Sequence, residues 1–245
     1  MLKGKTAFIT GANRGIGKAI FDKFIKNGAD IICAVRKKKP LFLKYVSAQE
    51  KKYKKKIKVI EFDLENDSKI KKTIQLLYKK KIIIDILVNN AGIADGSLIE
   101  MTSPNSIKNV FEINFFSQIR ITQLLLRLIK KSNAGSIINI GSLSGIVALR
   151  GAISYGSSKA ALMYATKVMA EEFSIHKIRV NSIAPNVTNT DMMKLMNKDA
   201  MKKLLKKSNL KKPHTVNQVA DQALFLASDK SLHKNGKIIK ITQNK

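Results

Sequence analysis

Cysteine and tryptophan are almost missing from this chain of 245 residues, which has one cysteine and no tryptophan. The single cysteine, Cys33, excludes an intramolecular disulfide and a zinc site of the cysteine type. Because Cys33 lies in the apolar run 31–35, we expect a buried core thiol. The three histidines do not cluster with acidic residues at metal-ligand spacing, so we expect no metal site.

Long apolar runs are also missing. No run approaches the ~20 residues that a membrane helix needs, and no segment resembles a signal peptide. The chain is therefore expected to have no contact with a membrane and to act in the cytoplasm.

Acidic residues are scarce, with 17 Asp and Glu against 46 Lys and Arg, which gives a formal net charge of +29. A positive charge of this size attracts nucleic acid, anionic lipid or acidic proteins. Only six basic residues are arginines, however, and no tryptophan is present for stacking on bases. We interpret the charge as a compositional bias that gives a solvated lysine surface. A nucleic-acid or acidic-surface binding protein on the same scaffold is the alternative from another class.

Short apolar runs alternate with helical patterns along the whole chain. The expected strands are 6–10, 31–35, 57–62, 83–88, 136–140, 177–183 and 237–241. Helical spacing is expected from the glycine turn to about 27, and over 68–80, 106–131, 154–174 and 216–227. This alternation predicts an α/β fold of the Rossmann type, a doubly wound parallel sheet of about seven strands in the order 3-2-1-4-5-6-7. We expect one domain over 1–245, with ligands bound at the carboxyl ends of its strands.

A glycine-rich turn follows the first expected strand and opens a helix. In that context its glycines allow close backbone approach, and the helix N-terminus favours a pyrophosphate. The cofactor-binding candidates of this turn are Gly11, Asn13, Arg14, Gly15, Ile16 and Gly17. The alternative is a plain structural turn.

Arginines decide the expected cofactor. The second strand ends without the acidic residue that would hold the ribose diol of NAD(H), and Arg36 stands there instead. Arg36 and Arg14 together suit a 2′-phosphate, because guanidinium groups bind phosphate bidentately. We therefore expect NADP(H), with NAD(H) as the alternative.

A tyrosine and a lysine stand four residues apart at the start of the helix over 154–174. Tyr155 and Lys159 share one helix face, and a lysine cation and an oxidised nicotinamide would both lower the tyrosine pKa towards neutrality. Ser142 ends the fifth strand at the same rim, where its hydroxyl can bond a substrate carbonyl. Proton transfer to or from a substrate oxygen is the chemistry that these side chains indicate.

Taken together, these motifs resemble the short-chain dehydrogenase/reductase family of single-domain enzymes over nearly the whole chain. The resemblance implies that Asn114 joins Ser142, Tyr155 and Lys159 as a catalytic residue by holding a water in a proton relay. It also implies that Tyr155 and Lys159 contact the cofactor. Further cofactor contacts implied by it are Asp63, Leu64, Asn90, Ala91, Gly92, Pro185, Val187 and Thr190. A homodimer or homotetramer is typical of the family, with the helices after strands four and five in the interface.

One departure from the family concerns Asn186, which follows Pro185 where the family has glycine. Asparagine tolerates left-handed backbone better than most residues, so we expect the turn to survive. A family member with an intact fold and another role is a further alternative. All four catalytic positions are filled, which argues against it.

The substrate is expected to lie under a lid at about 186–213, which is rich in methionine and leucine. By overall pattern the chain is most similar to 3-oxoacyl-acyl-carrier-protein reductase, whose partner is an acidic carrier protein. Four basic residues are expected to form part of a rim near the site entrance: Lys130, Lys131, His176 and Lys177. The alternative substrates are sugars, polyols and other small hydroxy or keto compounds.

Overall fold

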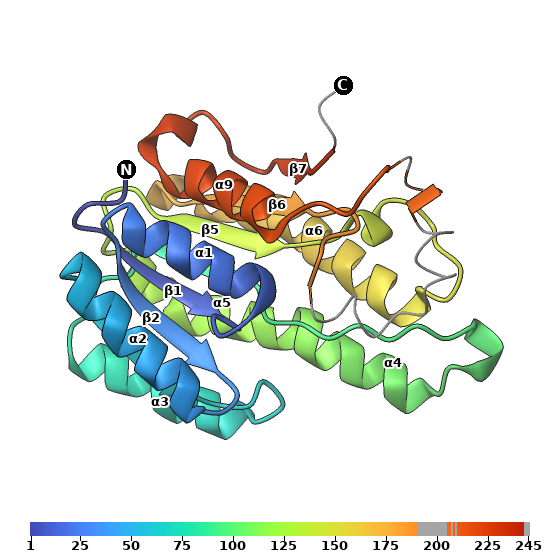
Figure 1. The fold of residues 1–245 in the computed structure, drawn as a ribbon, viewed down its shortest axis with the longest axis horizontal. Coiled ribbons are helices and arrows are strands. Elements are labelled where there is room, and N and C mark those ends of the chain that lie inside the picture. Colours follow the sequence, from blue (N-terminus) through green and yellow to red (C-terminus); the bar gives the residue numbers. More distant parts are fainter. Residues whose placement is uncertain (191–204, 207, 209, 243–245) are drawn as a thin grey trace.

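Seven parallel strands form one sheet in the order β3-β2-β1-β4-β5-β6-β7, as Figure 1 shows for the labelled strands. The computed structural model describes residues 1–190, 205, 206, 208 and 210–242. The strands are β1 (Thr6–Thr10), β2 (Asp30–Val35), β3 (Ile57–Glu61), β4 (Ile86–Asn89), β5 (Ser136–Ile140), β6 (Arg179–Ala184) and β7 (Ile238–Lys240). The predicted fold class and strand order are confirmed.

Helices cover both faces of this sheet (Figure 1). One apolar layer packs α1 (Gly15–Lys26), α2 (Pro40–Tyr53) and α9 (Val216–Ala227) on the sheet. The other packs α3 (Asp67–Lys79), α5 (Ser117–Ile129) and α6 (Ile153–Phe173), with α4 (Pro104–Phe111) beside α6. The strands read as nearly continuous apolar runs because both faces are buried. Cys33 is buried in the first layer, as expected, and burial raises its pKa.

The expected single helix over 106–131 is wrong, because a π-helix, Glu112–Phe116, separates α4 from α5. There the backbone N–H of Ser117 donates to the Glu112 carbonyl, five residues back. The Ser117 hydroxyl reinforces the wide turn, at 2.6 Å from the same carbonyl and 2.7 Å from that of Leu64. Such π-bulges often lie at functional sites.

The fourth strand also begins later than expected, at Ile86 and not at residue 83. The Asp85 carboxylate accepts the backbone N–H of Thr6 at 2.8 Å, while Ile84 N–H donates to Leu128 at the end of α5. Ile84 is therefore bonded to α5, whereas the backbone of Asp85 bonds Thr6 and Ser136 and leads into the strand that begins at Ile86.

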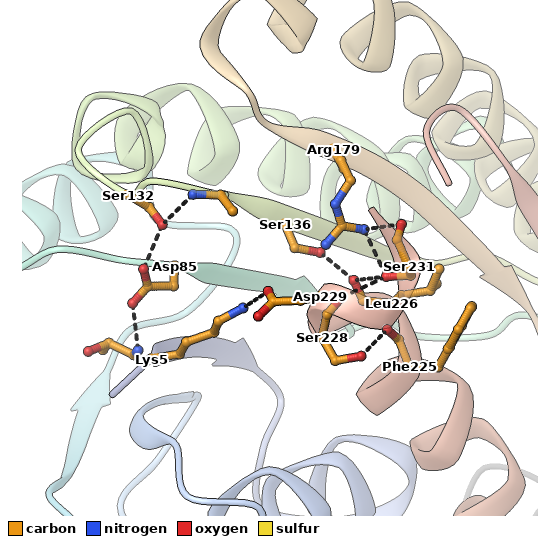
Figure 2. A network of polar contacts seen from close by, with 12 residues as sticks. Lys5, Asp85, Ser132, Ser136, Arg179, Phe225, Leu226, Ser228, Asp229 and Ser231 are labelled. Atoms are coloured by element: carbon orange, nitrogen blue, oxygen red, sulfur yellow. Dashed lines mark hydrogen bonds and ion pairs between the residues drawn. The ribbon is translucent and has the colours of Figure 1, made fainter. Parts of the chain in front are cut away.

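Polar side chains link the amino ends of the strands, at the edge opposite the glycine turn (Figure 2). Arg179 is 7% exposed and donates to the carbonyl of Ser231 at 3.1 Å and to its hydroxyl at 3.0 Å. Lys5 pairs with Asp229 at 2.5 Å. These contacts fasten the segment after α9 to β6 and to the start of β1.

Most of the expected lid, residues 191–204, 207 and 209, lies outside the described residues. Among the helices that the structure does describe, none has the length and apolar character needed to span a membrane.

Candidate active site

The predicted site residues gather at the carboxyl ends of the strands. The glycine turn joins β1 to α1, the segment over 89–92 follows β4, Ser142 follows β5, and the segment over 185–190 follows β6. In a parallel sheet these ends share one edge, and ligands of doubly wound folds bind there.

The glycine turn has the geometry of an anion cradle. Gly11 and Gly15 have φ angles of +65° and +53°, and a Cβ at Gly17 would stand 2.2 Å from the Gly11 carbonyl oxygen. Arg14 is the N-cap of α1 and makes no side-chain cap, so the first N–H groups of the helix remain available to a ligand. A pyrophosphate group fits this turn, whose left-handed residues favour glycine and whose close approach at Gly17 leaves no room for a side chain.

Thr10, at the end of β1, holds the segment after β4 against the turn. Its hydroxyl accepts the backbone N–H groups of Asn90 and Ala91, both at 2.9 Å. The Asn90 amide donates to the Thr10 carbonyl at 2.9 Å and to that of Gly11 at 3.3 Å. The turn and the segment over 90–92 thus form one hydrogen-bonded unit. Sequence reasoning missed this role of Thr10, for which a hydroxyl just before the first glycine was the available signal.

Arg36 and Arg14 differ in their surroundings. The Arg36 guanidinium is 2.7 Å from the Asp63 carboxylate and 3.7 Å from that of Glu65, and its side chain is 70% exposed. The Arg14 side chain is exposed, with no ion pair in the described part of the chain. A 2′-phosphate would therefore have to compete with two carboxylates for Arg36 but not for Arg14.

Ser142 and Tyr155 approach each other from β5 and from the first turn of α6. Ser142 is buried and caps a short 3-10 helix, Leu143–Gly145, by accepting the Ser144 N–H at 3.2 Å. Burial raises the pKa of Tyr155, whereas its hydrogen bond with the Ser142 side chain lowers it. The net direction is opposite to the one expected from a neighbouring lysine cation, because desolvation of the phenolate dominates.

Lys159 lies one turn further along α6 and is 4% exposed. Its ammonium donates to the Ile140 carbonyl at the end of β5 at 2.8 Å, and lies 5.9 Å from the centre of the Tyr155 ring. Burial lowers the pKa of Lys159 from 10.5 to about 8. A Cβ at Gly92 would stand 3.4 Å from this ammonium, so the segment after β4 reaches Lys159.

Asn114 is fully buried in the π-helix, and its side chain fastens two neighbours. It exchanges two hydrogen bonds with the backbone of Ile93, both at 2.9 Å, and donates to the Ser158 hydroxyl at 3.1 Å. Its side-chain oxygen would be 2.9 Å from a Cβ at Gly92. The π-helix therefore brings Asn114 to both the segment after β4 and helix α6.

The segment after β6 is held by two neighbouring loops. The Pro185 carbonyl accepts the N–H of Leu143, and Val187 and Asn189 bond the backbone of His214 at 2.8 and 2.9 Å. Asn186 keeps a negative φ, so its tolerance of left-handed backbone is not used. Its side-chain oxygen accepts the N–H of Val187 at 2.8 Å. Thr190 borders the glycine turn, 3.7 Å from a Cβ at Gly15.

A cavity of about 640 Å³ lies beside the first turns of α6, between residues 97–100 and the loop over 144–153. Its walls are mostly aliphatic and include Leu98, Ile146 and Leu149. Asp95, just before residues 97–100, joins its own segment to α6 and α4, since its carboxylate accepts the hydroxyls of Ser154 at 3.4 Å and Ser106 at 2.5 Å. Sequence reasoning gave no role to Asp95.

The expected basic rim near the site entrance is wrong for a single chain. Lys130 and Lys131 follow the end of α5, and His176 and Lys177 follow the end of α6. Helix α6 runs 21 residues from its first turn, which holds Tyr155, so its far end is roughly 30 Å away. These four residues therefore border the amino ends of the strands.

Comparison with known proteins finds similarity to short-chain dehydrogenases over most of the chain. The pattern of the short chain dehydrogenase family matches residues 5–201. The chain is 32% identical over 240 residues to the 3-oxoacyl-acyl-carrier-protein reductase FabG of Buchnera aphidicola subsp. Schizaphis graminum, covering 98% of this chain and 96% of that protein.

Other similar proteins carry different names. A 3alpha-hydroxysteroid dehydrogenase of Mediterraneibacter gnavus is 30% identical over 241 residues, with 98% and 96% covered. A solved short chain dehydrogenase of Mycobacterium paratuberculosis, bound to NAD, is 26% identical with a TM-score of 0.88, covering 99% of this chain and 98% of that one.

Proposed function

The chain belongs to the short-chain dehydrogenase family, and from this membership we propose that it is an NADP(H)-dependent oxidoreductase that interconverts a carbonyl and a secondary alcohol. One observation carries the proposal: Ser142, Tyr155 and Lys159 converge at the carboxyl edge of the sheet, beside a glycine turn fitted to a pyrophosphate. The preferred reaction is reduction of a 3-oxoacyl thioester on acyl carrier protein.

The proposed chemistry assigns one task to each of these side chains. The nicotinamide, when bound, supplies the hydride for the carbonyl carbon. The Tyr155 phenol donates its proton to the carbonyl oxygen, and its raised pKa keeps it protonated for this step. The Ser142 hydroxyl donates a hydrogen bond to the same oxygen as negative charge develops there.

Lys159, on α6, and Asn114, in the π-helix, complete this arrangement. The Lys159 ammonium, held on the Ile140 carbonyl, faces the segment after β4 and contacts the cofactor ribose in our proposal. Asn114 keeps that segment and α6 together and takes part in returning a proton to Tyr155.

Replacement of Tyr155 by Phe tests the mechanism, and Tyr53→Phe is the matched control because Tyr53 ends α2, outside both the site and the α5–α6 surface. Loss of the proton donor should lower kcat by about 10²- to 10⁴-fold and leave cofactor affinity nearly unchanged. Most activity retained in Tyr155→Phe would overturn the mechanism.

The preference for NADP(H) is supported by Arg14 and Arg36 and by the lack of an acidic residue at the end of β2. The Asp63 and Glu65 carboxylates compete for Arg36, and a solved relative holds NAD. Turnover with each cofactor decides between them. Arg36→Asp should shift preference towards NAD(H), and Lys72→Asp, on the exposed face of α3, is the control for charge alone. Equal turnover of the two cofactors by the wild type would contradict the preference.

The substrate proposal is supported by several curated relatives named as 3-oxoacyl-acyl-carrier-protein reductases and by the aliphatic walls of the cavity beside α6. Cofactor consumption should be measured with acetoacetyl carrier protein, its thioester mimic, a 3-ketosteroid and a panel of keto-sugars. Turnover of the thioesters alone supports the proposal. No turnover of either thioester rejects it, and turnover of a keto-sugar would favour the sugar and polyol alternative.

We also propose a homo-oligomer that pairs through α5 and α6. Three large side chains are exposed along this part of the surface: Phe116 (49%), Tyr164 (71%) and Val168 (40%). Burial of such a patch between two copies would remove apolar area from water. Light scattering after gel filtration tests this proposal, and a monomer at micromolar concentration would contradict it.

A further inference from the structure

Gln118, the second residue of α5, is a polar side chain inside the molecule with no place in the proposed chemistry. It is 1% exposed. Its side-chain nitrogen donates to the Ala91 carbonyl at 3.1 Å and to the Ile113 carbonyl at 2.9 Å. The first acceptor belongs to the segment after β4, and the second belongs to the π-helix.

The orientation of this amide follows from its two acceptors. An amide nitrogen has two protons to donate, and the two carbonyls use both. The reversed orientation would place the amide oxygen against two carbonyl oxygens and lose both bonds. The Gln118 oxygen has no hydrogen-bond partner within the described part of the chain, so only the donors of this side chain are used.

Each carbonyl that Gln118 holds is one step from a residue of the candidate active site. Ala91 is fastened through its N–H to the Thr10 hydroxyl at 2.9 Å, and Thr10 precedes the glycine turn. Ile113 precedes Asn114, whose side chain bonds Ile93 and Ser158. Gln118 therefore closes a continuous hydrogen-bonded path from the glycine turn to helix α6.

The space between these two segments leaves little tolerance for movement. A Cβ at Gly92 would be 2.9 Å from the Asn114 side-chain oxygen and 3.4 Å from the Lys159 ammonium. A small shift of the segment over 91–92 relative to the π-helix would therefore change the position of Asn114 and Lys159 beside the cofactor ribose. A misplacement near 1 Å can cost about 10²-fold in rate.

We propose that Gln118 is a positioning residue, which sets the separation between the cofactor-side segment after β4 and the π-helix that carries Asn114. It touches neither substrate nor reacting atoms and acts through Ala91 and Ile113. This inference rests on the proposed function, because it takes the segment over 90–92 to be the cofactor contact. An apolar side chain of the same length would fill the space but hold neither carbonyl.

The decisive variant is Gln118→Met, which keeps length and removes both donors. Gln118→Asn keeps the amide but is one methylene shorter, so it can hold one carbonyl at most. Gln75→Met is the matched control, because Gln75 is exposed on α3, outside the proposed α5–α6 interface. The melting temperature of each variant is measured first. The dissociation constants of NADPH and NADH, kcat and KM are then measured well below that temperature.

Gln118→Met should weaken cofactor binding and lower kcat by about tenfold each, with a smaller effect in Gln118→Asn and none in Gln75→Met. A variant that melts earlier but keeps the wild-type dissociation constant and kcat would overturn the proposal, since a purely structural role predicts that result. If the Met variant does not fold, the Asn variant decides by the same criterion. A wild type that binds neither cofactor would instead reject the proposed function and this inference with it.

Discussion

The ammonium of Lys159 donates to the main-chain carbonyl of Ile140 at 2.8 Å, so the helix that carries Tyr155 is joined to the end of the strand before Ser142. This bond fixes α6 against β5 from inside the protein. It also leaves a buried cation, and desolvation lowers its pKa to about 8.

Stability should therefore depend on pH through Lys159. Between its folded pKa of about 8 and its ordinary value of 10.5, the unfolded chain binds more protons than the folded one. The free energy of unfolding should rise by about 3 kcal/mol over this range because of this group. Below pH 8 both states are protonated, and the group adds no further slope.

Chemical denaturation from pH 7.5 to about 11 checks this by difference. The quantity is the unfolding free energy of wild type minus that of Lys159→Met, because the many surface lysines cancel in it. Lys72→Met, at an exposed position of α3, serves as control and should show a flat difference. A flat difference for Lys159→Met would contradict the lowered pKa.

Alcohol oxidation should become faster as pH rises, because Tyr155 must then accept a proton and burial raises its pKa. Ser142→Ala removes the hydrogen bond that lowers this pKa, so the midpoint of the pH–rate profile should move to higher pH. The rate at the plateau should fall as well, by about 10²-fold.

The profile is measured for kcat/KM in the oxidative direction, with Ser174→Ala as the control on the exposed end of α6. A midpoint that stays in place while the plateau falls would show that Ser142 acts on the substrate alone.

Gly17→Ala should abolish cofactor binding and destabilise the fold. The new Cβ would meet the Gly11 carbonyl oxygen at 2.2 Å and the Asn90 amide nitrogen at 2.4 Å, and neither contact can be relieved without moving the turn. We expect a loss of about 2–4 kcal/mol in unfolding free energy. Gly96→Ala is the control, since a Cβ there meets nothing within 4 Å. Thermal shift with and without NADPH reports both quantities, and equal results for the two variants would reject the cradle.

Arg179→Met should lower stability without changing the chemistry. It removes a buried guanidinium that holds the carbonyl and hydroxyl of Ser231 (Figure 2), which should cost about 2–4 kcal/mol. Because Arg179 lies at the amino end of β6, kcat/KM measured well below the melting temperature should match wild type. Arg127→Met, at an exposed position, is the control, and a changed kcat/KM in Arg179→Met alone would show that the two edges are coupled.

Sequence patterns predict the sheet because each strand is a short apolar run bounded by turns, and right-handed crossovers then leave few possible orders. They also predict that Ser142, Tyr155 and Lys159 lie at one edge of the sheet, because the end of a strand and an i, i+4 pair on a helix can both be identified from the sequence. The π-helix is different. It depends on hydrogen bonds from Ser117 and Gln118 to the carbonyls of Leu64, Ala91 and their own helix. The periodicity of apolar residues does not predict such partners.

Two further corrections have different origins. The raised pKa of Tyr155 follows from burial, which a spacing to Lys159 does not reveal. The basic residues after α5 and α6 precede β5 and β6, so they border the amino edge of the parallel sheet. The order of the elements along the chain indicates this position, whereas the charge of the residues does not.

The polar network lies at the amino ends of the strands, whereas the candidate active site lies at their carboxyl ends. One end holds the fold through Arg179, Ser231, Lys5 and Asp229, and the other carries the reactive side chains. Residues that line the cavity beside α6 can therefore change without touching the hydrogen bonds between Arg179 and Ser231. To change the substrate of this protein, stabilising substitutions would first be made at the amino edge. The loops after β4, β5 and β6 would then be varied.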